Sequence, residues 1–315
     1  AAFIAASGGG SVGQYGPLVH FGATMTEVLL KYIRIKIDRR VFIACGVAGA
    51  ISAGFNAPIA GVLFAHEALL RRISVGAIGP IAVTSIVAYA ANQAFFTLEP
   101  MFSLPDMPIE LQPLIPFLIF TGVFSALTSV AYMAAIRKGR ELATRSQWSM
   151  PKLLLSCVVV VGAIGVVVPD VAGLGLQQIN QMLDAQFGLG MLLVLLAGKI
   201  FVTAYCLNTG FFGGVFGPAL FVGAATGAVV AHVAILLGLA PHLSYALPVA
   251  AIAAVGGAVI GAPLTAIMIV IELTGSYAYG LSAMLCAILC SLLTLRFFGL
   301  SYFDRQLLDR GVDLR

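Results

Sequence analysis

Hydrophobic residues follow one another in this chain in long stretches that no charged residue interrupts. These stretches cover residues 41–66, 73–98, 111–136, 153–169, 200–271 and 273–295. A helix that crosses a membrane needs about 20 apolar residues, so each shorter stretch suffices for one crossing and the longest holds several. The pattern therefore predicts an all-α protein with several membrane-spanning helices.

Glycine, proline and charged residues divide the apolar stretches into individual helices. We expect helices over 17–33, 40–54, 57–70, 74–96, 112–140, 152–168, 188–206, 218–237, 245–260, 263–274, 278–297 and 303–311. Several are too short to cross about 30 Å of hydrocarbon at about 1.5 Å per residue. Glycine and proline at 54–58 and 261–263 break the pattern, and such backbone is tolerated in a membrane only where it is packed in protein or lines a water-filled cavity.

Two matched segments indicate an internal duplication. Residues 13–17 read GQYGP and residues 214–218 read GVFGP, and an apolar helix follows each. In both halves an Ala-Pro pair also precedes a glutamate at the same spacing, namely Glu67 and Glu272. Repeated broken helices are typical of transporters and point to a central solute site. We therefore predict a first repeat, a second repeat and a cytoplasmic-side tail helix at 1–113, 114–295 and 296–315.

The composition agrees with a membrane protein, since 60% of the residues are hydrophobic and 10% are charged. The net charge of +4 indicates no nucleic-acid partner, because the basic residues lie in loops between the apolar stretches. Under the positive-inside rule these loops face the cytoplasm, as does the C-terminus, and the acidic loop at 97–113 faces outward. We expect a multi-pass protein of the plasma (inner) membrane, embedded in the lipid bilayer.

The cysteines and the chain's start add two expectations. The five cysteines lie in apolar stretches without metal-ligand spacing, so we expect no disulfide framework, no metal site and no cofactor. The chain has no initiating Met, and its first repeat lacks counterparts of residues 114–169. We expect further residues upstream of Ala1, and the presence of regulatory domains beyond Arg315 stays open.

The matched segments at 13–17 and 214–218 have the chemistry of an anion site. A helix begins with unpaired backbone N–H groups and about half a positive charge, and glycine lets an ion approach them closely. Proline in the first turn removes a donor that would need a partner. Two such helix starts that converge would attract an anion without a buried Lys or Arg. Close helix packing is the alternative use of the glycines, and the duplication favours the anion site.

Residues 8–20, GGGSVGQYGPLVH, resemble the GxSxGxEGPxVH region of the CLC chloride channels and transporters. Residues 213–218 resemble the GxFxP element of that family, and further motifs match at 55–67, 262–272 and 300–304. The resemblance extends over nearly the whole chain. It implies the CLC fold, in which two inverted helical repeats bring broken helices together at mid-membrane. It also implies a homodimer with a separate anion pathway in each subunit.

The resemblance further implies which residues bind the transported anion. The backbone amides of Val215 and Phe216 and the hydroxyl of Tyr302 would hold a central chloride, with Gly16 and Tyr15 on the same path. A serine ligand from an upstream GSGxP motif has no counterpart in this sequence. The motif pattern favours chloride over fluoride, and the choice among chloride, bromide and nitrate stays open.

Two positions depart from the proton-coupled members of the family. Tyr15 stands where the resemblance places a gating glutamate, and Ala68 where it places an internal proton-accepting glutamate. A phenol stays neutral at physiological pH, whereas a carboxyl group whose pKa is raised can exchange protons there. We therefore expect a passive, uncoupled chloride channel in which Tyr15 is a neutral gate, or else a plug that blocks flow. A proton-coupled exchanger with non-standard gate residues is the alternative.

Other ionisable side chains in the apolar stretches have structural interpretations. Glu67 and Glu272 are expected to accept hydrogen bonds from freed backbone amides, and His20 and Lys199 to serve packing and helix-end pairing. His66 beside Glu67 is an alternative proton route, because ionisable residues at membrane depth are functional candidates by default.

An enzyme is the remaining alternative. Residues 9–13 fit the G-x-S-x-G pattern of serine hydrolases, with Ser11 as the nucleophile and His20 or His66 as the base. That pattern requires a strand before the serine and leaves the duplication unexplained. We expect no enzymatic activity.

Overall fold

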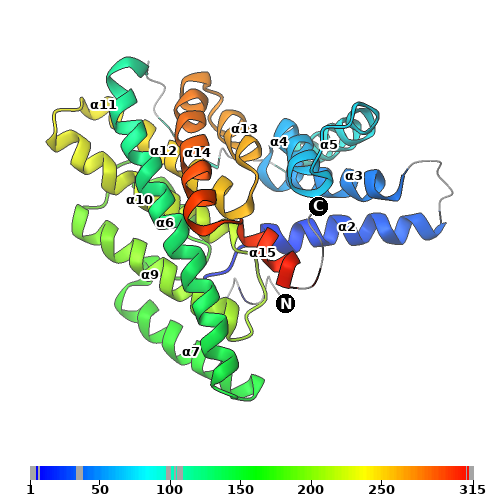
Figure 1. Cartoon of the computed structure of the whole chain (residues 1–315), viewed down its shortest axis with the longest axis horizontal. Helices are drawn as coiled ribbons and strands as arrows, with labels where there is room; N and C mark the ends of the chain where they lie inside the picture. The colour runs from blue at the N-terminus through cyan, green and yellow to red at the C-terminus, as the bar shows by residue number, and fades with distance from the viewer. Residues whose placement is uncertain are drawn as a thin grey trace.

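The structure is a computed structural model that describes residue 5, residues 8–32, 38–96, 101–102 and 104, residues 109–309 and residue 311. All regular elements in these ranges are helices, and their labels follow Figure 1. They are α2 (Tyr15–Tyr32), α3 (Arg39–Phe55), α4 (Pro58–Phe64), η1 (Ala65–Leu70), α5 (Val75–Phe95), α6 (Leu111–Arg145), α7 (Met150–Val167), η2 (Pro169–Val171), α8 (Leu176–Leu183), α9 (Leu189–Asn208), α10 (Phe216–Leu236), α11 (Pro241–Ser244), α12 (Ala246–Ile260), α13 (Pro263–Thr274), α14 (Tyr277–Phe298) and α15 (Tyr302–Asp309).

The predicted helices are confirmed, with small differences at their ends. The longest difference is at α6, which continues to Arg145 because its charged last turns remain helical beyond the apolar stretch. The sequence pattern missed α8, whose polar residues resemble a loop although Ile179, Met182 and Leu183 bury one face. It also missed the short elements η2 and α11 and the π-helical form of η1. The proposed division at 113 and 295 stays a prediction.

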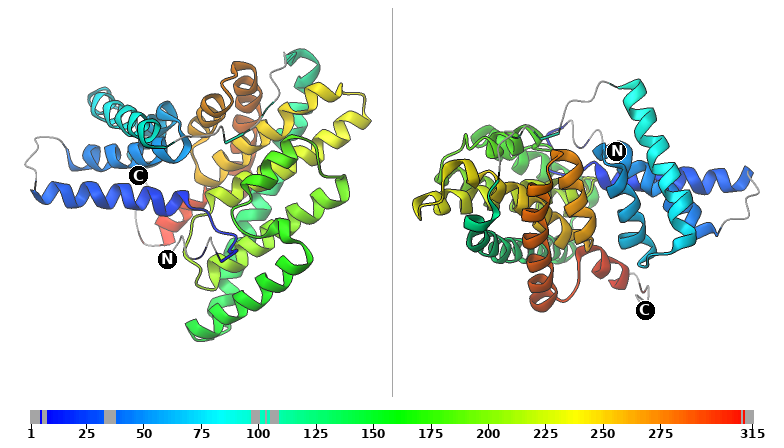
Figure 2. Two further views of the ribbon diagram at one scale, coloured as in Figure 1. Left: turned by 180° about the vertical axis from the view of Figure 1, so that it is seen from behind. Right: turned by 90° about the horizontal axis from the view of Figure 1, so that it is seen from above.

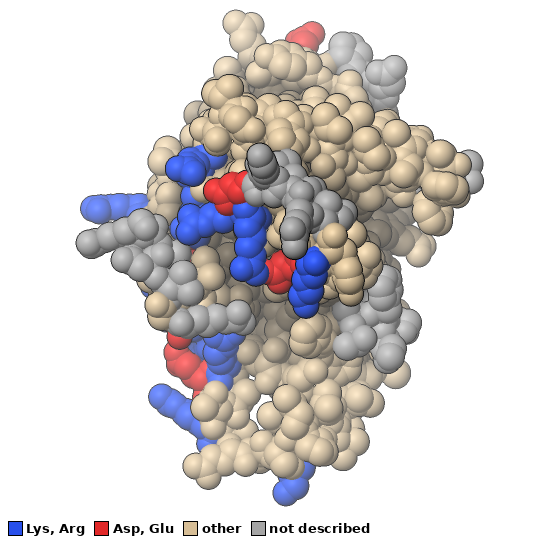
Figure 3. Space-filling model, turned by 90° about the vertical axis from the view of Figure 1, so that its right-hand side faces the viewer, with Lys and Arg blue, Asp and Glu red and all other residues tan. Residues whose placement is uncertain are grey.

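Within the described residues, seven helices are long and apolar enough to cross a membrane, and two shorter apolar helices are α13 and the continuous helix formed by α4 and η1. Apolar side chains such as Val83, Val158 and Leu292 are exposed on the outside of this bundle, as expected for surfaces that face lipid. Figure 3 shows one face of the molecule, where most of the surface is uncharged and Lys and Arg gather in its left-hand and central parts. The chain is an integral, multi-pass membrane protein.

The helices α10 and α12 form the core. Every residue of α12 is buried, and α10 is buried without interruption from Phe216 to Ala231. Glycine allows the two helices to touch, since a Cβ at Gly223 would lie 2.6 Å from the carbonyl oxygen of Ala251. Figures 1 and 2 show α2–α5 on one side of α13 and α14, and α6–α12 on the other. The two sides meet at the start of α2 and at the tail helix α15.

Candidate anion site

The two matched segments converge, as the sequence predicted. The amide of Gly13 donates to the carbonyl oxygen of Gly214 at 2.6 Å, and the amide of Gly214 donates to that of Gly13 at 2.7 Å. These residues hold equivalent places in the two halves. A Cβ at Gly13 would lie 2.8 Å from the amide nitrogen of Gly217 and 2.9 Å from the carbonyl oxygen of Gly214. Only glycine therefore permits this crossing without a shift of the backbone.

Each crossing segment starts a helix in the same way. In α2 the amide of Leu18 donates to the carbonyl oxygen of Gln14, and in α10 the amide of Ala219 donates to that of Val215, both at 3.1 Å. Pro17 and Pro218 in the first turns have no N–H group. The first N–H groups of both helices have no partner within the helix, so two positive helix ends point toward one region. This region can stabilise an anion with backbone groups alone.

Three aromatic rings cover the start of α2. Tyr15 is buried and stacks on Phe55, with ring centroids 3.8 Å apart and an interplanar angle of 16°. Phe216 meets both rings edge-on, at centroid distances of 5.9 Å from Tyr15 and 5.5 Å from Phe55. The hydroxyl of Tyr15 donates to the Sδ atom of Met101 at 3.7 Å. The predicted gate residue is therefore packed into a closed aromatic cluster.

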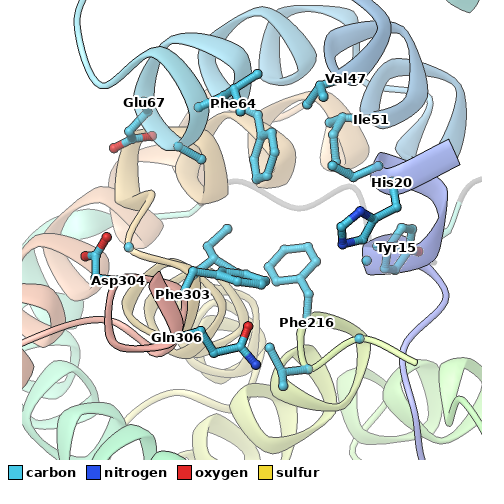
Figure 4. A pocket seen from close by; sticks show the side chains of 18 of the residues that line it. Tyr15, His20, Val47, Ile51, Phe64, Glu67, Phe216, Phe303, Asp304 and Gln306 are labelled. Atoms are coloured by element: carbon cyan, nitrogen blue, oxygen red, sulfur yellow. The ribbon is translucent and has the colours of Figure 1, made fainter. Parts of the chain in front are cut away.

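A cavity of about 440 Å³ lies directly against this cluster. Its walls come from α2, α3, the end of α4, η1, the 214–216 segment, the α12 end, α13 and α15. Figure 4 shows Tyr15 and His20 on one side of the cavity and Glu67 and Asp304 on the opposite side. Ala68, the second predicted departure from the family pattern, also lines it. Tyr15 and Ala68, the two residues that differ from the family pattern, thus line the same cavity.

Four of the five predicted anion-site residues line this cavity, namely Tyr15, Gly16, Val215 and Phe216. The fifth, Tyr302, lines a separate small hollow with Arg137 and Phe298, and its hydroxyl accepts a hydrogen bond from Gln306 at 2.9 Å. Its neighbours Phe303 and Gln306 do face the main cavity. Tyr302 therefore stands one residue away from the cavity wall in this structure.

Two aromatic residues near the site were missed by the sequence analysis. Tyr132 on α6 is fully buried, and its hydroxyl donates to the carbonyl oxygen of Val215 at 2.9 Å. This bond fixes the peptide just before the start of α10. Phe55, which stacks on Tyr15, belongs to a motif that the sequence analysis had noted, but its contact with Tyr15 depends on the tertiary fold. No local pattern distinguishes Tyr132 from an ordinary buried tyrosine.

Glu67 and Glu272 each cap a broken helix of the other half. The carboxylate of Glu67 accepts from the amides of Leu264 and Thr265 at 3.0 and 2.8 Å, at the start of α13. The carboxylate of Glu272 accepts from the amides of Ile59 and Ala60 at 2.8 and 2.7 Å, at the start of α4. The expectation that both glutamates bond to freed amides is confirmed. The hydroxyl of Thr265 adds a third bond to Glu67, at 2.7 Å.

The wall of the cavity includes an ion pair between Arg71 at the end of η1 and Asp304 on α15. Ser301 also donates its hydroxyl to Asp304, at 2.8 Å. Arg71 has a φ angle of 55°, in the left-handed region that non-glycine residues adopt uncommonly. These contacts join the first half of the chain to the tail helix beside the cavity.

The remaining predicted side chains have separate places. Lys199 is buried and donates to the carbonyl oxygens of Val171 and Gly173 at 3.1 and 2.7 Å, which confirms its expected role at a helix end. The ring of His20 lines the cavity instead of packing between helices, which corrects its expected role. His66 is buried and its Nδ1 lies 2.9 Å from the carbonyl oxygen of Val62. Ser11 shares a 2.8 Å hydrogen bond with Thr203 and has neither histidine as a partner.

A family model described as Voltage gated chloride channel matches residues 1–295. The chain belongs to this family, the CLC proteins. It is 30% identical over 289 residues to the chloride channel protein ClcB-like of Ralstonia nicotianae, which covers 89% of this chain and 67% of that protein. It is 29% identical over 308 residues to the H(+)/Cl(-) exchange transporter ClcA of Vibrio vulnificus, which covers 91% of this chain and 65% of that one.

The CLC chain also shares its fold with solved structures. A slow cyanobacterial Cl−/H+ antiporter aligns with a TM-score of 0.88 at 19% identity, over 98% of this chain and 74% of that one. The fold is thus the predicted arrangement of two inverted repeats with broken helices at mid-membrane. The chain spans about two thirds of the length of the curated relatives named above, at 67% and 65%.

The expectation of a passive, uncoupled channel is wrong. Vibrio relatives that match most of this chain are named exchange transporters, and solved structures of this fold include a Cl−/H+ and a fluoride/proton antiporter. The expectation assumed that proton coupling depends on carboxylates at positions 15 and 68 alone. The structure gives a physical reason to abandon that assumption, because further titratable side chains, including His20 and Asp304, line the same cavity.

Proposed function

We propose that this chain forms the transport pathway of a proton-coupled chloride exchanger that uses non-standard gate residues. The observation that carries the proposal is the crossing at Gly13 and Gly214, which brings two helix starts together beside the cavity. Backbone N–H groups at these starts bind chloride weakly enough for it to leave again, as transport requires. The names of the Vibrio relatives support exchange as the activity.

In this proposal the amides of Val215, Phe216 and Gly16 hold the anion, and the ring of Tyr15 closes the pathway on the side of Met101. The stacking of Tyr15 on Phe55 supports this role, because a ring held in a packed cluster separates the cavity from the opposite side. Tyr302 reaches the anion only after a small shift of α15, since its neighbours Phe303 and Gln306 already face the cavity.

The assembly and orientation complete the proposal. The basic loops and the C-terminus lie on the cytoplasmic side of the plasma membrane, as the positive-inside rule indicates. The part of the cavity wall that holds Arg71 and Asp304 then lies toward the cytoplasm. Two copies form a homodimer with one pathway in each. Mass measurement of the purified protein in detergent tests this stoichiometry.

Exchange is tested in liposomes that contain the purified protein and no other transporter. An outward chloride gradient should drive protons into the liposomes against their own gradient, and a protonophore should abolish the resulting pH difference. Liposomes without protein and liposomes with sulfate in place of chloride are the controls. Chloride flux without any uphill proton movement would refute the proposed exchange.

The role of Tyr15 is tested by Tyr15→Ala. Loss of the ring opens the aromatic cluster, so chloride flux should rise while the coupling to protons falls. Tyr15→Phe is the matched control, since it keeps the stacked ring and loses only the hydroxyl bond to Met101. An equal flux in Tyr15→Ala and the unaltered protein would contradict the assignment of Tyr15 as the closing residue.

A further inference from the structure

Proton-coupled exchange requires a side chain that gains and loses a proton while it is in contact with the transport pathway. The cavity beside the anion site is lined by five ionisable side chains, which are Tyr15, His20, Glu67, Arg71 and Asp304. They come from α2, from η1 and its end, and from α15. α3 presents only the apolar side chains of Val47 and Ile51 to this space. The proton carrier can therefore be sought among these five groups.

The two carboxylates already accept hydrogen bonds from groups in other parts of the protein. Glu67 accepts from two backbone amides and a hydroxyl at the start of α13. Asp304 pairs with Arg71 and accepts from Ser301. A proton on either carboxyl group would turn an acceptor of these bonds into a donor. Protonation of either group would break contacts that join the two halves of the protein.

Arg71 and Tyr15 are also unsuited to carry the proton, each for its own reason. Arginine keeps its charge under all physiological conditions. The phenol of Tyr15 is buried among aromatic rings and directs its hydroxyl to Met101, away from the cavity. Neither side chain exchanges a proton with water in the cavity.

His20 differs from these four groups. Its side chain is exposed, it lines the cavity, and its ring makes no hydrogen bond to any residue that the structure describes. In Figure 4 the ring extends from α2 into the cavity on the same side as Tyr15. His20 also follows Gly16 by four residues, so both lie on one face of α2, about 6 Å apart along the helix axis.

We propose that His20 is the proton carrier of this exchanger, a role that replaces the carboxylates absent at positions 15 and 68. In its neutral form the ring takes up a proton from water in the cavity at one ring nitrogen. The same nitrogen releases this proton at a later step of the transport cycle. No other bond forms or breaks. Because the ring lies one helical turn from the anion-binding amide of Gly16, its charge acts on the anion directly. This inference rests on the exchange activity proposed above.

The test compares His20→Gln with the unaltered protein in the proton and chloride assays described above. Glutamine keeps a polar side chain of similar size and cannot be protonated. Proton movement per chloride should fall by about tenfold or more, as expected when a positioned proton-transfer group is removed, while chloride flux persists. His242→Gln is the matched control, because His242 is exposed on α11 and does not line the cavity.

A second variant, His20→Glu, covers the case in which glutamine also lowers chloride flux. Glutamate can be protonated, so proton movement should return, with its pH dependence displaced toward the lower pH range of a carboxyl group. Return of chloride flux without proton movement in His20→Glu would overturn the inference. So would normal coupling in His20→Gln.

These outcomes also separate the inference from the proposed function. Absence of uphill proton movement in the unaltered protein would refute exchange itself, before any variant is compared. Size-exclusion profiles of each variant identify any that fails to fold. A coupled protein whose coupling survives His20→Gln would keep the proposed function and lose only its assigned carrier.

Discussion

The two halves of the molecule start their central helices in the same way and then pack them very differently. In the second half, α10 is buried from Phe216 to Ala231 and lies against a fully buried α12. In the first half, only Tyr15 and Thr26 of α2 are buried, and side chains such as Phe21 are exposed. The repeated sequence motif therefore specifies the helix start, and the surrounding helices decide how deeply the helix is buried.

This difference indicates that the halves depend on different interactions. The second half is stabilised by a large apolar core, in which no single contact dominates. The first half is joined to it by a few specific contacts, chiefly the crossing at Gly13 and Gly214 and the reciprocal caps of Glu67 and Glu272. Substitutions at these contacts should have effects out of proportion to their size.

The largest effect is expected when the reciprocal caps are removed. Glu67→Gln and Glu272→Gln each replace a carboxylate that accepts two backbone amides with a side chain whose NH2 group must face one of those amides, so that two donors are left unpaired. At roughly 1–3 kcal/mol per unsatisfied donor, each variant should lose about 2–6 kcal/mol of stability. Thermal denaturation of the detergent-purified protein measures the loss.

Glu141→Gln is the control for these two variants. Glu141 lies on the surface and its carboxylate is 4.0 Å from the side chain of Arg137, so loss of its charge should lower the stability little. If either cap variant denatures at the same temperature as Glu141→Gln, the caps do not join the two halves as described.

A smaller effect is expected at the crossing, where the two equivalent glycines are not equally crowded. A Cβ at Gly13 would come within 3.0 Å of two backbone atoms, whereas at Gly214 the nearest atom would be 3.0 Å away. Gly13→Ala should therefore destabilise by about 1–3 kcal/mol, and Gly214→Ala by less. Gly79→Ala, on α5 with no atom within 4 Å of the added Cβ, is the control. The reverse order of the two crossing variants would show that the halves are not held together in this geometry.

Much of this architecture could be predicted from the sequence. The spans are visible because a helix in lipid must be long and apolar, and their ends are visible because glycine and proline interrupt them. The crossing of 13–17 with 214–218 could be predicted from the duplication. The roles of Glu67 and Glu272 could be predicted as well, since a buried carboxylate near a helix break needs donors.

The remaining features depend on which segments meet in space. α8 escaped the sequence analysis because its eight residues carry their apolar side chains on one face only. The stacking of Phe55 on Tyr15 and the bond from Tyr132 to Val215 join residues far apart in the chain. The wrong expectation of an uncoupled channel has the same origin. That expectation rested on positions 15 and 68 alone, whereas His20 and residues of the distant tail helix also line the cavity.

The last prediction concerns the hydroxyl group that distinguishes the two caps. Thr265 donates a hydroxyl to Glu67, and its counterpart in the first half is Ala60, which has none to offer Glu272. Thr265→Ala should cost about 1.5–3 kcal/mol, as for one hydrogen bond to a charged group, and Thr265→Ser should retain most of that bond. In the Thr265→Ala background, Glu67→Gln should then cost no more than Glu272→Gln does in the unaltered protein. If Glu67→Gln still costs more stability than Glu272→Gln in that background, the two caps differ in burial rather than in this hydroxyl. A double-mutant cycle between positions 67 and 265 would then give no coupling energy.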